Sequence, residues 1–274
     1  MAQQQVQIQS LQTEDLTLRA ELANLLEIDD YVALAWVHDR PTVQFRAVNL
    51  QVVNGAGSET ANGLGNILIG YEGERTEPYF EPECSRGTGV GASFQDPITT
   101  RSECLAAGGT WQLDHKGGSH YLVVGSNHNY SGYSGIVAGM GNTSNSPYAS
   151  VTGGLYNIAQ GWGTSVSGGA RNRAMGYLAS VAGGSHNVAS GQRSSVAGGA
   201  NNVASGAQTS ISGGSFNDAI GVTSAVAGGT GNSAEGELSA ISGGGGNTAS
   251  GAVSSVSGGR GHTESDVFGW GVGE

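Results

Sequence analysis

A unit of fifteen residues repeats between Ser150 and Gly259 without a single insertion or deletion. Each full unit has a Val or Ile, a small residue, a Gly pair, an Asn, and then an Ala followed two residues later by another Gly. The Val or Ile anchors are Val151, Val166, Val181, Val196, Ile211, Val226, Ile241 and Val256. One short unit repeated in strict register indicates a solenoid, in which every unit packs against its two neighbours.

The length of the unit selects strands rather than helices. Fifteen residues are too few for two helices and a turn, whereas two strands of about four or five residues and two Gly-containing turns fill one coil. The Asn and the Ala of each unit are two residues apart, which places both side chains on one face of a strand. The Asn column consists of Asn142, Asn157, Asn172, Asn187, Asn202, Asn217, Asn232 and Asn247. We therefore predict a mainly β fold, a parallel β-roll or β-solenoid of fifteen-residue coils.

The recurring Asn has an explanation that needs no ligand. Identical side-chain amides stacked at the strand spacing of about 4.8 Å can bond to one another along the solenoid axis. A Ca²⁺-binding β-helix would need an Asp in every turn, and these units have none at that place. We interpret the repeated positions as structural columns rather than binding residues, represented by Val151, Val166, Val181, Val196, Asn157, Asn172, Asn187 and Asn202.

The residue after each Val or Ile points to the opposite face of its strand and is small in every unit. This column is Thr152, Ser167, Ala182, Ala197, Ser212, Ala227, Ser242 and Ser257. A freely solvated face would vary in size and charge, as the turn positions of these units do. The column therefore predicts that this face packs against a second copy of the chain, while the turns meet solvent and carry any recognition.

The unit Ser180–Ser194, SVAGGSHNVASGQRS, resembles the repeats of trimeric autotransporter adhesin heads. The resemblance covers about residues 119–262, and it implies a left-handed β-roll and a homotrimer whose three rolls pack side by side. This chain departs from the family in two respects. The family's unit is usually one residue shorter, and it has a hydrophobic residue where this chain has the first Gly of the pair. No binding residue of the family can be transferred to this chain.

The N-terminal segment, residues 1–35, carries a second signal for oligomers. A heptad pattern places apolar residues at its two core positions, which are Leu11, Leu18, Leu25 and Val32 at one and Ile8 and Leu22 at the other. The pattern predicts an amphipathic helix over about residues 4–30, which in front of a trimeric roll would form a parallel coiled coil. The alternative is an ordinary helix that lies on a domain.

Residues 36–71 form a β connector and the first coil of the roll. Val43 and Phe45 alternate with polar residues, and a second alternating run over residues 48–52 is shifted by one residue, which predicts two short strands with a bend near Ala47. Asn54-Gly55 predicts a turn. The run of residues 67–70, ILIG, recurs in kind as LVVG at residues 122–125.

This recurrence predicts that the solenoid starts near residue 64 and is interrupted by an insertion over residues 72–118. The β-roll repeats then occupy residues 119–266. A C-terminal cap over residues 267–274 would cover the open strand edges with Phe268 and Trp270.

The insertion contains both cysteines of the chain, Cys84 and Cys104. Two cysteines in a loop rich in Gly, Ser and Thr predict a disulfide, worth about 3 kcal/mol in the chain-entropy model and suited to an oxidising compartment. The alternative is a zinc site formed by Cys84, Cys104, His115 and His120, although their spacing matches no standard zinc module.

Composition limits the functions that this chain can have. The formal net charge of −11 argues against nucleic acid and anionic lipid as partners. The sequence has no run of about 20 apolar residues that would span a membrane. The Ser and Thr residues lie in repeating columns, and the sequence indicates no catalytic group, metal site or cofactor site. We therefore expect a protein that is not an enzyme.

Aromatic residues cluster in the first units, at Tyr130, Tyr133, Tyr148, Tyr156, Trp162 and Tyr177. Trp162 and Tyr177 share one turn position in successive units, and Tyr156, Arg171 and His186 share another. Exposed rings are typical of surfaces that bind sugars or proteins. The candidate ligand-binding residues are Tyr148, Tyr156, Trp162, Arg171 and Tyr177. The alternative is that these turns only cover the end of the roll beside the insertion.

These features together predict an extracellular or cell-surface fibrous protein, an adhesin or structural element that binds a glycan or protein receptor. The alternative is a phage or phage-like tail fibre or spike, which would not need the signal peptide that the polar start Met1–Gln5 lacks. Ice binding would require an outward ladder of Thr. The relevant column is too mixed for it: Thr164, Ala179, Ser194, Thr209, Ser224, Ser239 and Ser254.

Overall fold

The computed structural model describes residues 7, 13–18, 31–37, 40–45, 48–57, 61–71, 73, 75, 83–85, 100–106 and 108–271. The chain divides into two compact units, Met1–Gln51 and Val52–Glu274.

The first unit contains a helical stretch and a hairpin. Residues 13–18 are α-helical, and most of the predicted coiled-coil helix lies outside the described residues. The coiled coil therefore stays a prediction. Strand β1 (Val32–Val37) pairs antiparallel with β2 (Arg40–Phe45), so that Val32 lies opposite Phe45.

Two predictions for this part of the chain are wrong. The heptad pattern placed Val32 in the helix, but this residue begins β1, where cross-strand pairs of apolar and aromatic side chains stabilise the hairpin. The second strand that we predicted over residues 48–52 does not form. Residues 48–53 are not part of any β-ladder. The predicted turn is confirmed: Gly55 has a positive φ of 74°, and the Asn54 side chain accepts a hydrogen bond from the Ala56 N–H.

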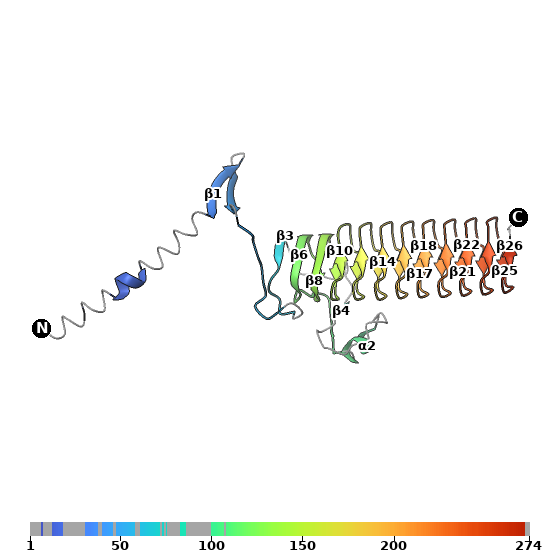
Figure 1. Cartoon of the computed structure of the whole chain (residues 1–274), viewed down its shortest axis with the longest axis horizontal. Coiled ribbons are helices and arrows are strands. Elements are labelled where there is room, and N and C mark those ends of the chain that lie inside the picture. Colours follow the sequence, from blue (N-terminus) through green and yellow to red (C-terminus); the bar gives the residue numbers. More distant parts are fainter. Residues whose placement is uncertain are drawn as a thin grey trace. The chain divides into compact units, whose positions relative to one another are not determined.

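The second unit is a β-solenoid made of two parallel sheets (Figure 1). Among the described residues, the large sheet has twelve strands and the small sheet ten. The large sheet consists of β3 (Ile67–Tyr71), β6 (Ser119–Ser126), β8 (Tyr133–Met140), β10 (Ser150–Val151), β12 (Ser165–Val166), β14 (Ser180–Val181), β16 (Ser195–Val196), β18 (Ser210–Ile211), β20 (Ala225–Val226), β22 (Ala240–Ile241), β24 (Ser255–Val256) and β26 (Trp270–Gly271). The small sheet consists of β7 (Asn129–Tyr130), β9 (Thr143–Ser144), β11 (Ile158–Ala159), β13 (Arg173–Ala174), β15 (Val188–Ala189), β17 (Val203–Ala204), β19 (Asp218–Ala219), β21 (Ser233–Ala234), β23 (Thr248–Ala249) and β25 (Thr263–Glu264).

Each coil follows the same path. It passes through a strand of the large sheet, a first turn, a strand of the small sheet and a second turn, as over residues 180–194. The next coil repeats this path fifteen residues later, so Val181 pairs with Val196 and Ala189 with Ala204. The predicted period and register are thus confirmed.

The predicted first coil is confirmed as well. Strand β3 pairs in parallel with β6, with Ile67 opposite Leu122 and Gly70 opposite Gly125. The chain therefore begins its solenoid before the insertion and resumes it afterwards. The left-handed winding implied by the adhesin resemblance stays a prediction.

The interior of the roll is shielded from solvent. The Val or Ile anchors and the Ala of each coil are buried and form one continuous core. Burying one Val contributes about 1.5–3 kcal/mol, so stability accumulates coil by coil. The mixed column that begins with Thr164 also faces inward, and the hydroxyls of Thr164, Ser194 and Thr209 donate to the carbonyl three residues earlier. Burial is therefore a more direct reason than composition to reject an ice-binding face there.

The Asn column forms a hydrogen-bonded ladder, but not between side-chain amides as predicted. Oδ1 of Asn187 accepts the backbone N–H of Asn202, 3.0 Å away. Nδ2 of Asn187 donates to the carbonyl of Gly183 in its own coil and to that of Gly199 in the next. A backbone N–H closes the ladder because the preceding turn presents it to the amide oxygen. Each buried amide therefore has partners for its oxygen and for both of its hydrogens.

Histidines occupy both ends of this ladder. At the start, His128 Nδ1 accepts the N–H of Asn142, and His128 Nε2 lies 3.1 Å from the carbonyl oxygen of Val124. The ring thereby reproduces two bonds of an Asn, with the proton on Nε2. At the other end, the N–H of His262 donates to Oδ1 of Asn247.

The last coil changes the residues that face inward. Gly271 occupies the place of the Val anchor, and the imidazole of His262 lies where a side chain on Gly271 would be. Glu264 occupies the Ala position and lies 3.7 Å from His262 Nε2. Phe268 and Trp270, which we predicted to cap the end, are 76% and 68% exposed. The predicted cap over residues 267–274 stays a prediction, and the polar pair of His262 and Glu264 occupies the interior of the terminal coil.

The small-residue column lies on the outer face of the large sheet. All eight of its members, from Thr152 to Ser257, are exposed in the isolated chain. The face is therefore free to pack against another molecule, and the predicted second copy of the chain stays a prediction.

The insertion contains β4 (Glu83–Ser85), α2 (Arg101–Ala106) and β5 (Thr110–Gln112), with β4 antiparallel to β5. Thr100 and Glu103 form a capping box at the start of α2: the Glu103 N–H donates to Thr100 Oγ1, and the Thr100 N–H donates to Glu103 Oε2. Cys104 is buried in α2, while the side chain of Cys84 lies outside the described part of the chain. The Cys84–Cys104 disulfide stays a prediction.

The stacking of the coils predicts opposite effects for the two glycines of one pair. Gly199 has a φ of +87°, and a Cβ there would lie 2.1 Å from the carbonyl oxygen of Gly214. A Cβ on Gly198 would have no atom within 4 Å. Gly199→Ala should lower the free energy of unfolding by at least ~2 kcal/mol, measured by chemical denaturation. Gly198→Ala is the matched control, with a change within about 1 kcal/mol of zero; equal destabilisation by both would contradict the stacking geometry.

Candidate binding surface

Four aromatic side chains form a continuous ladder along one edge of the first coils, one from the start of β8 and three from second turns. We call Tyr133, Tyr148, Trp162 and Tyr177 the aromatic ladder. Consecutive ring centroids are 5.2, 5.3 and 5.2 Å apart. This separation is close to the strand spacing, because each coil contributes one ring. The structure thus brings together three of the five candidate residues and adds Tyr133, which shares their edge of the roll.

The ring orientations determine what a ligand would meet. Trp162 and Tyr177 are stacked at an interplanar angle of 14°, whereas Tyr148 meets its two neighbours edge to face. The ring faces are therefore largely occupied by neighbouring rings. The outer side of the ladder offers ring edges, together with the polar groups that Tyr and Trp carry at those edges.

The other two candidates lie on the opposite edge of the coils, in the first turns. The Arg171 guanidinium lies 5.7 Å from the centroid of the Tyr156 ring, an arrangement suited to a cation–π interaction. In the next coil, His186 Nδ1 is 2.7 Å from the hydroxyl of Ser185. Tyr156 and Arg171 therefore form a second, smaller surface. The five predicted residues do not make one patch.

Tyr130 does not belong to the surface, although it is part of the same aromatic cluster in the sequence. Its side chain is buried, and its ring lies 5.6 Å from that of Tyr121. Burial raises the pKa of Tyr121 to about 12, and the Tyr121 hydroxyl donates to the carbonyl of Ser144. These two rings fill the first coils, where no Ala column yet narrows the interior.

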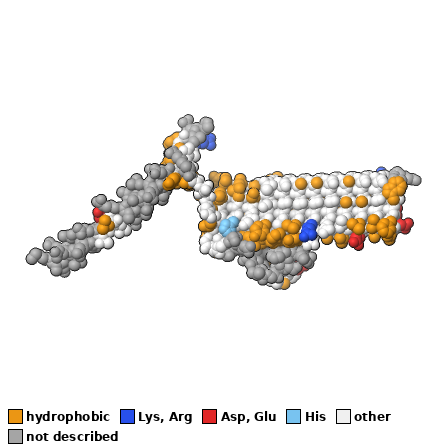
Figure 2. Space-filling view, viewed as in Figure 1, with side chains coloured by type: hydrophobic (Ala, Val, Ile, Leu, Met, Phe, Trp, Pro, Cys, Tyr) orange, Lys and Arg blue, Asp and Glu red, His pale blue; other side chains and the backbone are white. Residues whose placement is uncertain are grey.

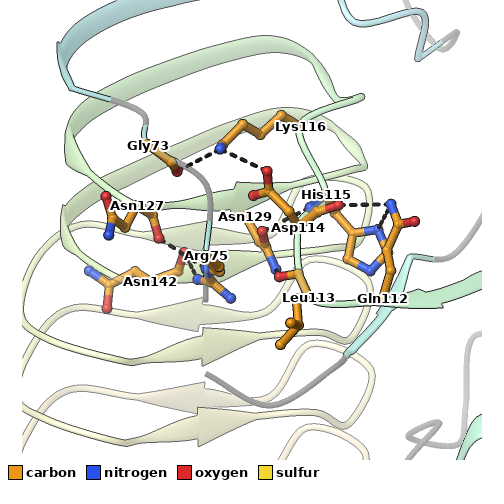
Figure 3. A network of polar contacts seen from close by, with 10 residues as sticks. All are labelled: Gly73, Arg75, Gln112, Leu113, Asp114, His115, Lys116, Asn127, Asn129 and Asn142. Atoms are coloured by element: carbon orange, nitrogen blue, oxygen red, sulfur yellow. Dashed lines mark hydrogen bonds and ion pairs between the residues drawn. The ribbon is translucent and has the colours of Figure 1, made fainter. Parts of the chain in front are cut away.

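A network of polar contacts joins the two ends of the insertion to the first coils (Figure 3). The guanidinium of Arg75 is buried and donates to the carbonyl oxygens of Asn127, Gly141 and Asn142. At the other end of the insertion, the backbone N–H of His115 donates to Oδ1 of Asn129. Backbone carbonyls accept most of these bonds, so the network holds the insertion on the roll.

Lys116 and Gln112 complete this network. Lys116 Nζ donates to the carbonyl of Gly73 and forms an ion pair with Asp114 at 3.0 Å. Gln112 Nε2 lies 3.2 Å from Nδ1 of His115. Sequence reasoning missed Arg75 in this role, because nothing in its surroundings in the chain indicates that the side chain is buried.

The alternative zinc site of Cys84, Cys104, His115 and His120 is only partly covered by the described residues. Among the residues that the structure describes, no group of three or more His, Cys, Asp or Glu side chains could hold a metal ion. The side chain of Cys84, a member of the alternative set, is not described. Within the described chain, no helix is both long and apolar enough to cross a membrane.

No protein-family model matches this chain, and no curated protein matches it.

The buried His128 predicts a pH dependence of stability. Burial lowers the pKa of His128 below its ordinary value of 6.5, and the positive charge of Arg75 lowers it further. The unfolded chain therefore takes up this proton at a higher pH than the folded chain does. Stability from this group is complete above pH 6.5 and decreases as the pH falls below that value.

Denaturation at a series of pH values measures this effect. His128→Asn is the matched variant, because Asn occupies the same column in the following coils and does not titrate. The wild type should lose more stability than His128→Asn between pH 6.5 and the lowered pKa. Identical pH profiles would contradict this prediction, because they would show that the folded chain binds a proton at His128 as readily as the unfolded chain does.

Proposed function

We propose that this chain is an extracellular, adhesin-like fibrous protein that acts as a homotrimer and binds a glycan or protein receptor through the turns of its first coils. The observation that carries the proposal is the aromatic ladder, a run of four large rings in contact with one another along one edge of the roll. Aromatic side chains supply much of the binding energy at protein surfaces. The inward columns repeat almost unchanged, so the turns are where recognition can vary from coil to coil.

The outer face of the large sheet supports the homotrimer. Its small residues allow the backbone of a second copy to approach closely along the whole roll. At the first coils the same face carries Ile67, Leu122 and Ile136, which are 41%, 37% and 38% exposed. Large apolar side chains at one end of a flat, small-residue face are suited to burial against identical side chains of other copies.

The orientation of the rings narrows the mode of binding. Stacked faces are not free for a sugar ring, so a ligand would lie across the ring edges and bond to the tyrosine hydroxyls and the tryptophan N–H. An extended glycan or peptide that runs along the axis could contact one ring per coil. Because all of these functions are binding functions, we propose a protein that is not an enzyme.

A phage or phage-like tail fibre is the second candidate. The same trimeric roll would serve it, and the difference lies in the receptor. An adhesin would bind glycans or proteins of host cells or matrix, whereas a tail fibre would bind polysaccharides of a bacterial envelope.

Light scattering tests the homotrimer. The purified chain should have about three times the mass of 27.6 kDa expected for one chain. A variant with Ala197→Glu and Ser212→Glu, which places charges in the exposed small-residue column of the large sheet, should dissociate without unfolding. A monomer at micromolar concentration would contradict the packing argument, as would a trimer that both glutamates leave intact.

Receptor binding is tested on arrays of host glycans, matrix proteins and bacterial envelope polysaccharides. Trp162→Ala should weaken binding by about tenfold or more, because it interrupts the ladder at its largest ring. Phe216→Ala is the matched control, since Phe216 is an exposed aromatic residue in a first turn outside the ladder. Equal binding by Trp162→Ala and the wild type would show that the aromatic ladder is not the binding surface. The class of array target that binds decides between adhesin and tail fibre.

A further inference from the structure

The second turns of the C-terminal coils carry exposed apolar side chains that form a second ladder. We call this set the apolar ladder, and it consists of Val222, Leu238, Val253, Val267 and Phe268. The turns are stacked directly on one another, because the Leu238 N–H donates to the carbonyl of Val222 and the Phe268 N–H donates to that of Ala252. In Figure 2, apolar side chains gather along one edge of the roll. Leu238 and Val253 are 50% and 41% exposed.

The backbone at these positions makes the side chains costly. Leu238, Val253 and Phe268 have φ values of 58°, 58° and 60°, in the left-handed region that side chains disfavour, β-branched ones most of all. The first turns of the same coils reach the left-handed region with Gly231 and Gly246 instead. Glycine thus avoids the backbone strain in the first turns of these coils, whereas the second turns keep bulky apolar residues. Arg193, Gln208 and Thr223 hold the same turn position in earlier coils with similar φ values, so forming the turn does not require an apolar side chain there.

The surroundings of the apolar ladder are acidic. Glu235, Glu237 and Asp266 lie in the same second turns and are exposed. Between residues 205 and 271, Arg260 is the only Lys or Arg in the sequence, and it lies in a first turn. Burial raises the pKa of Asp218, and the negative charge of Glu235 raises it further. Charge complementarity therefore selects a partner that is both apolar and basic.

We propose that the apolar ladder binds a basic amphipathic helix of a partner protein. Successive coils are about 4.8 Å apart, and one turn of an α-helix rises about 5.4 Å. A helix that lies along the roll axis therefore places about one apolar side chain beside each of four successive coils. Lys or Arg residues beside the apolar stripe of the helix pair with Glu235, Glu237 and Asp266.

The chain's own N-terminal segment does not fit this surface. Residues 4–30 contain six acidic residues, which are Glu14, Asp15, Glu21, Glu27, Asp29 and Asp30, and one basic residue, Arg19. Like charges would repel such a helix from the ladder, and an anionic lipid surface is disfavoured for the same reason. The apolar ladder lies on other coils than the aromatic ladder, so its binding of a helix does not depend on the proposed function.

Fluorescence anisotropy with the full-length protein tests the proposal. The probe is a labelled synthetic helix-forming peptide with Leu along one face and Lys along the other, and its control has Glu in place of every Lys. The Lys peptide should bind and the Glu peptide should not. The double variant Leu238→Gly, Val253→Gly should weaken binding of the Lys peptide about tenfold or more. Its melting temperature should stay equal or rise, because Gly relieves the left-handed strain.

Two further variants keep the test decisive. Phe216→Gly removes an exposed apolar residue with a φ of 55° from a first turn and should leave binding unchanged. The double variant Glu235→Gln, Glu237→Gln changes no backbone preference, and it should weaken binding and reduce its salt dependence. Equal binding by the Glu peptide would overturn the proposal, as would a lower melting temperature or a changed mass for the double glycine variant. If the wild type bound neutral lipid vesicles and the double glycine variant did not, the apolar ladder would be a membrane-binding surface instead.

Discussion

The hydrogen bonds of the buried asparagines connect each coil to the next, and the rest of the roll depends on them. Backbone bonds, such as those from the Ser195 N–H to Thr209 and from the Ala197 N–H to Ile211, join successive coils along the walls of the roll, and the asparagines add a link across its interior. Each Asn amide supplies it by holding its own first turn and by binding the backbone of the following coil, as Asn202 does with Gly198, Gly214 and Asn217. Because these amides are buried, an unmade bond would leave a polar group without water. The ladder therefore holds each coil in register with the next, and it does so across first turns of different length: Asn142 lies five residues after Val137, whereas Asn157 lies six residues after Val151.

This constraint explains where the chain can vary. A Cβ on Gly191 would lie 1.9 Å from the carbonyl oxygen of Gly206, so this Gly is required by the close approach of the next coil. The first Gly of a pair, such as Gly198, and the outward-facing turn residues have room for larger side chains. Two ladders use this freedom on one edge of the roll. The rings of the first coils contact one another, whereas the apolar residues of the last coils remain exposed beside acidic groups.

Much of the roll could be predicted from the sequence, because its period is visible in single columns of residues. The run at residues 67–70 predicted the first coil across an insertion of more than forty residues, since apolar residues and Gly recur there in the same order. Trp162 and Tyr177 were predicted to be neighbours for the same reason, and their rings are stacked.

The remaining features depend on contacts that a column does not reveal. Val32 continues the heptad pattern, but its pairing with Phe45 places it in a strand. Tyr130 is adjacent to exposed aromatics in the chain, yet it packs on Tyr121 inside the first coils. The cap at His262 and Glu264 has a signal that could have been found: both residues stand in the register of the Asn and Ala columns. Their polar side chains there indicate the last coil.

The most direct test of the asparagine ladder compares two neighbouring positions by chemical denaturation. Asn202→Ala leaves the Gly198 carbonyl and the Asn217 N–H without their partner inside the roll, and it removes one of the two donors to the Gly214 carbonyl, which keeps the Ala200 N–H. Asn201→Gly changes the adjacent exposed residue, whose φ of 55° suits Gly. The ladder predicts that Asn202→Ala lowers the free energy of unfolding by about 3 kcal/mol or more, while Asn201→Gly leaves it nearly unchanged. Equal stability of the two variants would contradict the account.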